Sequence, residues 1–366
     1  MTEFRVKIFG AGSIGNHLCH ASRVLGWHVD LCDIDGDALR RAREEIYPSR
    51  YGAWDETIGL YHADDAPRGG YNLIVVGIPP DHHVDVAMTA LEEEPAALLI
   101  EKPICGPGLE GASELLRSIE NSPTKSFVGY NHVVGSATKK VEEVLASGTV
   151  GVIETIDAEV REHWGGIFAA HPWLAGPSDS YLGFTERGGG AVGEHSHALN
   201  LWQHFACLAG AGRVSMVSAS AAYVSDSGAN YDKISAINLT TESGLVGRVV
   251  QDVITRPPRK WGRIQGEKGC VEWHFEYKAG IDAVFWEGID GSGEHLVEKT
   301  RPDDFIAELM HISEVVRGEI SESPISIDRG LDTALVVAAA HKSARQGEAV
   351  HIDFSKGYNV SALHSR

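Results

Sequence analysis

Residues 4–15 read Phe-Arg-Val-Lys-Ile-Phe and then Gly-Ala-Gly-Ser-Ile-Gly, an apolar run that leads directly into a G-x-G-x-x-G turn. The alternation in the first half predicts a strand, and the segment after the turn has helical character. The first glycine permits the tight turn, the second lets the backbone approach a diphosphate, and the third lets the helix pack on the strand. The turn therefore predicts a dinucleotide site with contacts from Gly10, Gly12, Ser13, Ile14 and Gly15.

A carboxylate completes this pattern. Asp33 ends the next apolar run, 27–32, close to the spacing of about 20 residues at which such motifs place an acid for the adenosine ribose. An acid there repels a 2′-phosphate, so we expect NAD rather than NADP as the cofactor. Arg40 and Arg41 follow soon after and leave NADP as the less favoured alternative.

Composition limits the possible partners. The chain has 366 residues, 43% hydrophobic and 23% charged, which is typical of globular proteins long enough for two domains. A net charge of -19 argues against nucleic acid or an anionic membrane as a partner, because both require clustered Lys and Arg.

The cysteine pattern and the hydropathy of the chain predict its cellular compartment. The five cysteines are scattered without a C-x-x-C pair, so neither a disulfide framework nor a thiolate metal site is indicated. The first strand begins soon after Met1, and no apolar run is long enough to span a bilayer. We expect a cytoplasmic protein.

The order of elements predicts an α/β protein with two domains. Strands and helices alternate over residues 1–128, which predicts a Rossmann, doubly wound parallel sheet. Over residues 129–366 we expect an α+β domain with a large, open, mostly antiparallel sheet that has one solvated face. The expected strands lie near 4–9, 27–32, 72–78, 97–101 and 126–130, then near 152–160, 214–224, 233–240, 245–254, 261–265, 270–276 and 349–353; the later helices lie near 136–147, 303–317 and 329–346.

Four further segments carry a resemblance. They are Ile78-Pro79-Pro80 with His83, then Glu101-Lys102-Pro103, then Gly129-Tyr130-Asn131-His132, and finally three glycines at 188–190 followed by His197. With the glycine-rich turn, the chain resembles the glucose-fructose oxidoreductase / inositol dehydrogenase / rhizopine catabolism superfamily of NAD(P)-dependent oxidoreductases over most of its length.

The resemblance implies a catalytic pair, Lys102 and His197. Lys102 lies just past the carboxyl end of a predicted strand, the edge where ligands bind in doubly wound sheets. The chain departs from many members in having Gly193 where they carry an aspartate four residues before the histidine. Glu194 lies three residues before His197, so we expect both on one helix face, with Glu194 orienting His197. His197, with a pKa near neutrality, would then be the base, and Lys102 would polarise the substrate oxygen.

The resemblance also implies the nicotinamide end of the cofactor site. His83 is ambiguous, because it contacts the cofactor in one interpretation and caps the next helix in the other. The expected contacts are Ile78, Pro79, Pro80, His83, Glu101, Lys102 and Asn131.

A metal site is the alternative interpretation of the crowded polar residues Glu194, His195, His197 and His204. Residues two apart on a helix point to different faces, and this group contains no histidine pair spaced i, i+4. We expect no metal.

The substrate side is an aromatic and polar region. Rings there would stack on a sugar while a guanidinium binds a carboxylate or phosphate. The alternative is that this loop is packed against the sheet or against another subunit. The candidate substrate contacts are His132, Arg161, His163, Trp164, Trp173, Tyr181 and Arg187.

The expected activity is hydride transfer between nicotinamide and a hydroxyl carbon of a sugar, sugar derivative or cyclitol. The substrate would be a small sugar-like molecule, and the open sheet would form a homodimer or homotetramer. Two alternatives within the resemblance are a glycosidase that recycles NAD internally and a cofactor-binding sensor. An enzyme acting on imines or dihydrodiols is less favoured.

Overall fold

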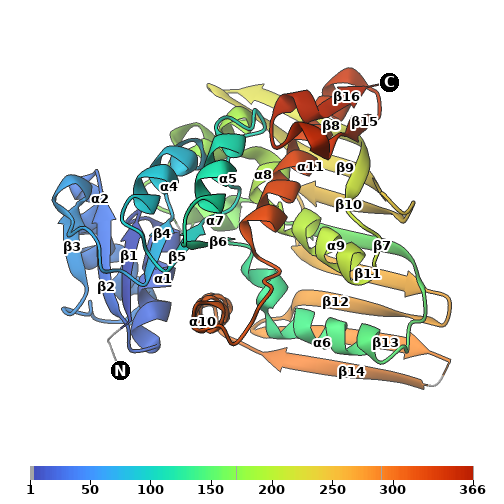
Figure 1. Ribbon diagram of the computed structural model, residues 1–366, viewed down its shortest axis with the longest axis horizontal. Coiled ribbons are helices and arrows are strands. Elements are labelled where there is room, and N and C mark those ends of the chain that lie inside the picture. Colours follow the sequence, from blue (N-terminus) through green and yellow to red (C-terminus); the bar gives the residue numbers. More distant parts are fainter. Residues whose placement is uncertain (1–3, 170, 290, 366) are drawn as a thin grey trace.

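The computed structural model describes residues 4–169, 171–289 and 291–365, and two sheets organise the chain (Figure 1). The smaller sheet is formed near the N-terminus and the larger one by the rest of the chain.

The first sheet is parallel throughout and has the order β3-β2-β1-β4-β5-β6. This order confirms the predicted doubly wound sheet. β3 was not predicted, because its residues are half-buried or exposed at the sheet edge and lack a continuous apolar run. The strands are β1 (Arg5–Phe9), β2 (His28–Asp33), β3 (Gly59–His62), β4 (Leu73–Val76), β5 (Ala97–Ile100) and β6 (Lys125–Val128).

Helices connect these strands in the right-handed manner that parallel sheets require. The helices are α1 (Ser13–Val24), α2 (Gly36–Arg41), the π-helix η1 (Ala42–Ile46), α3 (Tyr47–Tyr51), α4 (His83–Leu91) and α5 (Ala112–Glu120). α1 begins at Ser13, so the last glycine of the turn, Gly15, lies inside the helix.

The second sheet has the order β14-β13-β12-β11-β7-β10-β9-β8-β15-β16, and β7 and β10 are its parallel neighbours. The predicted large, mostly antiparallel sheet is confirmed. β13, β14 and β16 were not predicted, since β14 is largely exposed and β16 is only three residues long. The strands are β7 (Ile153–Arg161), β8 (Val214–Asp226), β9 (Ala229–Thr241), β10 (Val246–Asp252), β11 (Arg259–Gly266), β12 (Gly269–Lys278), β13 (Ile281–Gly288), β14 (Gly291–Glu298), β15 (Val350–Ile352) and β16 (Leu363–Ser365).

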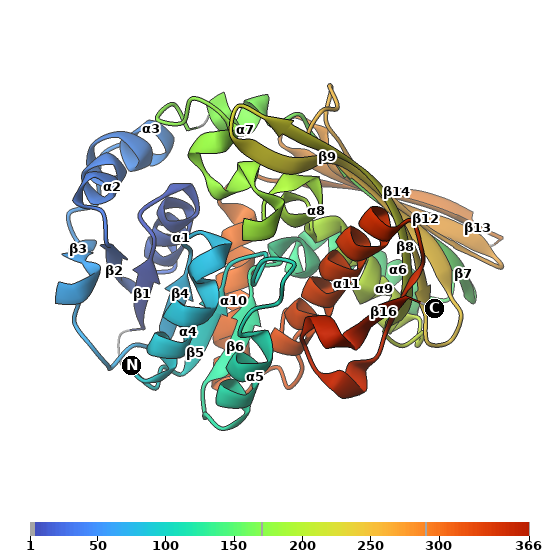
Figure 2. The ribbon, with the colours of Figure 1, turned by 90° about the horizontal axis from the view of Figure 1, so that it is seen from above.

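Helices cover only one face of the large sheet. Figure 2 shows this sheet nearly edge-on, with the helices on the side facing the first sheet; no helix of the described ranges covers its other side. The covering helices are α6 (Ser136–Ala146), α8 (Gly190–Glu194), α9 (His197–Leu208) and α11 (Ile327–Gln346), while α10 (Asp303–Arg317) packs on α1. No described helix is both long and apolar enough to cross a membrane.

Candidate active site

The glycine-rich turn forms a cradle beside β4. Gly10 has φ +108°, and a Cβ there would collide with the carbonyl oxygen of Gly77, just after β4. A Cβ on Gly15 would collide with the Gly10 carbonyl, whereas Gly12 faces open space. The cradle therefore leaves room at Gly12 and at the start of α1, where a diphosphate binds to free N–H groups.

Two side chains brace this turn. Asn16 donates to the carbonyl oxygens of Ala11 (3.1 Å) and Gly12 (2.8 Å), a contact that the sequence analysis missed. Asp33 Oδ2 accepts from the Ala11 N–H at 2.7 Å. Carboxylate oxygens have further lone pairs, so Asp33 still has capacity to accept ribose hydroxyls. The turn, its free N–H groups and Asp33 fit a dinucleotide.

Arg40 and Arg41 are occupied by carboxylates. Arg40 Nη1 lies 3.2 Å from Glu44 Oε2 and 3.0 Å from Glu45 Oε1, and Arg41 Nη2 lies 3.3 Å from Asp35 Oδ2. A 2′-phosphate would have to compete with these anions. This arrangement is consistent with NAD as the cofactor.

His83 joins two loops. It is the first residue of α4, its ring is buried, and its Nδ1 and Nε2 contact the carbonyl oxygens of Pro103 (2.9 Å) and Ile78 (2.7 Å). Burial lowers the pKa of His83 to about 4 against the opposing effect of these carbonyls. The ring connects the Ile78-Pro79-Pro80 loop to the segment after Lys102, and its expected contact with the cofactor stays a prediction.

Lys102 and Glu194 form the centre of the site. Lys102 Nζ donates to the Glu194 carbonyl oxygen at 2.8 Å and to Glu194 Oε2 at 3.1 Å, and the two side chains are only 11% and 18% exposed. Tyr181 donates to the same carboxylate oxygen at 3.4 Å. Burial alone would raise the pKa of Glu194, but the charge of Lys102 and these hydrogen bonds lower it below its ordinary value. An ammonium has three donors, so one N–H of Lys102 remains for a ligand.

The expected pairing of Glu194 with His197 is wrong in this structure. α8 ends at Glu194 and α9 begins at His197, so the two residues do not share a helix face. Glycines at 188–190 and Gly193 produce a short helix and a break, which the i, i+3 spacing could not reveal. His197 Nδ1 is buried and has no hydrogen-bond partner among the described residues.

His197 lies against aromatic rings. Its ring centroid is 4.5 Å from that of His132 and 5.5 Å from that of Tyr130, both approached edge-on. Burial, followed by the neighbouring His132 and Lys102, lowers the pKa of His197 well below its ordinary value. The expectation of a pKa near neutrality is therefore wrong, and His197 is a neutral imidazole at physiological pH.

Two further carboxyls near this centre are buried. Glu101 is 7% exposed, and Glu308 on α10 is fully buried with both oxygens unpartnered among the described residues. Burial raises the pKa of Glu101 to about 7, and burial together with the neighbouring Glu101 raises that of Glu308 well above its ordinary value. No motif pointed to Glu308, because its neighbours in the chain form an ordinary helical pattern.

Two more of the expected residues adjoin this centre. Asn131 is 9% exposed, and its Oδ1 is buried without a partner in the described ranges. The ring of His132 lies between His197 and Phe275, whose centroid is 4.6 Å away. Both residues belong to the short helix η4 (Asn131–Val134), which packs against α9 and α10.

The other expected substrate residues are dispersed. Arg161 binds Asp252 at 2.6 Å, and strand alternation turns it to the sheet face opposite Val160. Trp164 is 7% exposed and packs on Phe168 and Tyr231. Neither is brought to Lys102, which agrees with the interpretation that this loop is packed against the sheet.

Arg187, His163 and Trp173 have local partners. Arg187 Nε lies 2.7 Å from Asp81 Oδ2, so it connects the loop before α8 to the first domain. His163 contacts Arg256 Nη2 at 2.9 Å, and the Trp173 ring lies edge-on to His171. Among the six residues from this loop region, Tyr181 is the one that contacts the Lys102 and Glu194 pair.

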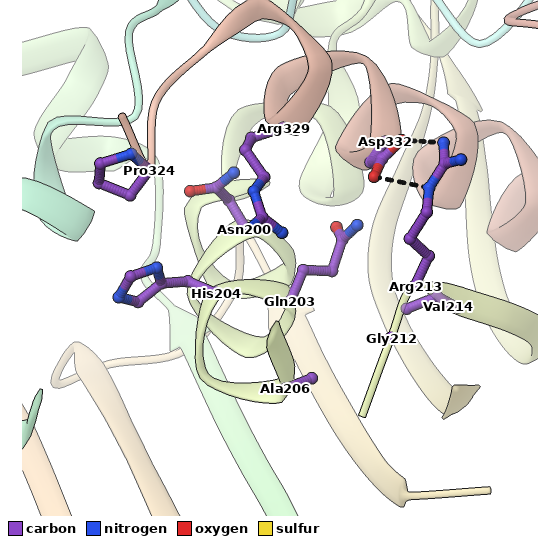
Figure 3. Close-up of a pocket in the computed structure, with 10 residues that line it drawn as sticks. All are labelled: Asn200, Gln203, His204, Ala206, Gly212, Arg213, Val214, Pro324, Arg329 and Asp332. Atoms are coloured by element: carbon purple, nitrogen blue, oxygen red, sulfur yellow. Dashed lines mark hydrogen bonds and ion pairs between the residues drawn. The ribbon is translucent and has the colours of Figure 1, made fainter. Parts of the chain in front are cut away.

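A small pocket lies away from this centre, between α9 and α11 (Figure 3). Asn200, Gln203 and Arg329 line it, and the Oδ1 and Oε1 of the two amides have no partner among the described residues. The space for water centres is about 10 Å³, roughly one molecule. This pocket is a site for water and is too small for a sugar.

No group of three or more His, Cys, Asp or Glu side chains within the described ranges is arranged to hold a metal ion. Glu142 accepts from His204 Nε2 at 2.7 Å, which turns His204 away from Glu194.

Solved structures with this fold include several oxidoreductases. An oxidoreductase from Agrobacterium radiobacter in complex with NAD+, L-tartaric acid and magnesium is 19% identical, with TM-score 0.75 over 96% of this chain and 98% of that one. Levoglucosan dehydrogenase in complex with NADH and L-sorbose is 17% identical, with TM-score 0.75 over 96% and 100%. The WlbA dehydrogenase from Bordetella pertussis, in complex with NADH and UDP-GlcNAcA, is 19% identical, with TM-score 0.71 over 96% and 99%.

A curated relative adds little about function. An uncharacterised protein of Schizosaccharomyces pombe is 24% identical over 180 residues, which are 42% of this chain and 47% of that protein. The match spans about half the length of that relative.

Family models match both parts of the chain. The model of an oxidoreductase family with an NAD-binding Rossmann fold matches residues 4–130, and the model of the GFO/IDH/MocA C-terminal domain matches residues 138–272. The chain is therefore a member of the GFO/IDH/MocA family of NAD-binding oxidoreductases.

Proposed function

We propose that this protein is an NAD-dependent dehydrogenase that acts on a hydroxyl carbon of a sugar, a sugar derivative or a cyclitol. The observation that carries the proposal is the position of Lys102 Nζ, held by two oxygens of Glu194 with one donor left free. A free ammonium N–H in a partly buried site is suited to bind the hydroxyl or carbonyl oxygen of a substrate.

The residues that would hold the cofactor are those of the first domain. Backbone N–H groups of Ser13 and Ile14 would bind the diphosphate, and Asp33 the adenosine ribose. NAD supplies the hydride acceptor when bound. The side chains around Lys102 position the substrate oxygen and manage its proton.

Lys102 and Glu194 together are suited to move that proton. Lys102 Nζ would pass a proton to Glu194 Oε2, and the neutral amine would then take the hydroxyl proton of the substrate as its carbon is oxidised. Tyr181 holds the same carboxylate oxygen in place. His197, neutral and packed edge-on to His132, is assigned a contact with the substrate rather than the role of primary base.

The substrate class rests on fold relatives. Levoglucosan dehydrogenase was solved with L-sorbose, and the Bordetella enzyme with UDP-GlcNAcA. These relatives favour carbohydrates, and the polar side chains near Lys102 are consistent with a ligand rich in hydroxyls.

The uncovered sheet face is our candidate for subunit contact. Val246 and Leu296 lie on it and are 52% and 46% exposed. A homodimer or homotetramer would cover these two apolar side chains. Sedimentation equilibrium of the wild type and of Val246→Lys tests this arrangement, and an unchanged monomer would exclude it.

The test of activity is absorbance of reduced nicotinamide with NAD and a panel of sugars, uronates, cyclitols and nucleotide sugars. We expect one class to be oxidised by the wild type and by the control Lys140→Met, whose lysine pairs with Glu143 on α6. Lys102→Met should lose activity. Release of free sugar from a glycoside without net NADH would favour the recycling glycosidase, and bound cofactor with no turnover would favour a sensor.

A further inference from the structure

Two arginines lie beside the first turns of α1, and each comes from a different part of the chain. Arg50, at the end of α3, donates from Nη1 to the Ser13 carbonyl oxygen at 3.0 Å and contacts His17 Nε2 at 3.3 Å. The ring of Phe305 stacks on His17 with centroids 5.0 Å apart. Arg301, which precedes α10, has its Cζ 5.8 Å from the Phe305 ring. The four side chains thus form a continuous group.

Neither guanidinium has a carboxylate within ion-pair distance in the described part of the chain. Their contacts there are a carbonyl oxygen, an imidazole and an aromatic ring. Two other arginines do form ion pairs. Arg43 binds Glu56 at 3.0 Å, and Arg317, at the other end of α10, binds Glu319 at 2.7 Å. In a chain with net charge -19, two unpaired guanidiniums close together are unusual.

The group has a positive local field. Burial, followed by Arg301 and Arg50, lowers the pKa of His17 to about 3, so this ring stays neutral. Burial and the charge of Arg301 lower the pKa of Arg50. Glu276, a carboxylate near Arg301, is itself bound to Lys260 at 2.8 Å. Like charges held together without a counter-ion favour the binding of an anion.

We propose that Arg50 and Arg301 form a phosphate-binding site beside the glycine-rich turn. A phosphate is the anion that best matches two guanidiniums, which offer several donors in fixed planes. Two sources of phosphate fit this chemistry, namely the diphosphate of the dinucleotide and a phosphate carried by the substrate. The contact of Arg50 with Ser13, the first residue of α1, favours the cofactor, because the diphosphate binds at this helix start.

The site spans both parts of the molecule. Arg50 belongs to the first domain, and Arg301 follows β14 of the large sheet and leads into α10. A phosphate bound by both arginines would connect the two parts across α1. The inference rests on cofactor binding and does not depend on which substrate is oxidised.

The experiment measures binding by calorimetry, without turnover. The probes are NAD, ADP, adenosine and, with NAD saturating, inorganic phosphate. The variants are Arg50→Gln, Arg301→Gln and Arg50→Lys, and the controls are Arg43→Gln and Arg317→Gln, whose arginines are ion-paired. Each Gln variant should weaken NAD and ADP by about 10-fold, the usual effect of losing a hydrogen bond to a charged group, and leave adenosine unchanged.

These binding measurements distinguish the cofactor diphosphate from a substrate phosphate as the ligand of the two arginines. Weaker ADP binding with unchanged adenosine binding assigns the site to the cofactor diphosphate, and Arg50→Lys should then recover part of the loss. Weaker inorganic phosphate binding with unchanged ADP binding assigns it to a substrate phosphate. Unchanged binding of every probe in folded variants overturns the proposal. The melting temperature of Arg301→Gln should not fall, because Arg301 has no ion pair within the described residues; a fall would indicate a structural role instead.

Discussion

Lys102 Nζ lies 2.8 Å from the carbonyl oxygen and 3.1 Å from the carboxylate Oε2 of Glu194, a residue from the other domain. The lysine follows β5 of the parallel sheet, next to the edge strand β6, and the glutamate ends α8. One residue therefore accepts two hydrogen bonds from the lysine and fixes its direction. This arrangement differs from the histidine-centred relay that the sequence suggested.

Glu194→Gln should lower kcat while the fold is kept. The amide preserves size and the carbonyl contact, but it removes the charge that holds Lys102 and accepts its proton. Loss of positioned acid–base catalysis typically costs 10²–10⁴-fold, so we expect a fall of about 100-fold or more in steady-state kinetics. Glu186→Gln is the matched control, because Glu186 pairs with Arg345 on the surface. Equal kcat in both variants would exclude Glu194 from the relay.

His197→Asn should leave the acid limb of the pH–rate profile in place. Since the pKa of His197 lies well below its ordinary value, the ring is already neutral where an unperturbed histidine titrates. We expect a changed KM for the substrate and an unchanged apparent pKa in kcat. His295→Gln, at an exposed position on β14, is the control. An acid limb near 6.5 that vanishes only in His197→Asn would contradict this assignment.

The two sheets could be predicted from the sequence because the local sequence patterns agree with the observed strands and helices. The turn at 10–15 lies between a buried strand and a helix, and its glycines are required by close contacts that the structure confirms. The exposed strand β14 carried no such signal, because edge strands lack the apolar alternation on which prediction depends.

The site was only partly predictable, because contacts between distant segments decide it. Spacing placed Glu194 beside His197, whereas the break between α8 and α9 turns Glu194 toward Lys102. Arg161 looked available in the sequence but is paired with Asp252 on β10. Such pairings depend on strand register, which a motif does not contain.

Asp33→Ala should weaken NAD binding and reduce discrimination against NADP. The variant loses the ribose acceptor and also the acceptor that holds the Ala11 N–H in the turn. We expect KM for NAD to rise by about 10-fold, and the ratio of kcat/KM between NAD and NADP to fall. Asp37→Asn, on exposed α2, is the control. An unchanged cofactor ratio would show that Asp33 acts only in the turn.

The buried carboxyls Glu101 and Glu308 should make stability depend on pH. In the unfolded chain both ionise near 4.5, whereas the folded pKa of Glu101 is about 7 and that of Glu308 is also raised. Protons are therefore bound more tightly by the folded state, and stability that is fully present below about pH 4.5 is lost as pH rises toward 7. The slope is at most about 1.4 kcal/mol per pH unit for each group.

Glu308→Gln isolates this effect. The amide is neutral at every pH and similar in size to the protonated carboxyl, so it should remove the slope due to Glu308 and leave the slope due to Glu101, whose pKa is raised by burial. Urea unfolding between pH 5 and 8 measures the slope, and Glu314→Gln provides a control on the same helix. If Glu308→Gln and the wild type lose stability in parallel over this range, Glu308 is ionised in the folded protein and a cation must neutralise it.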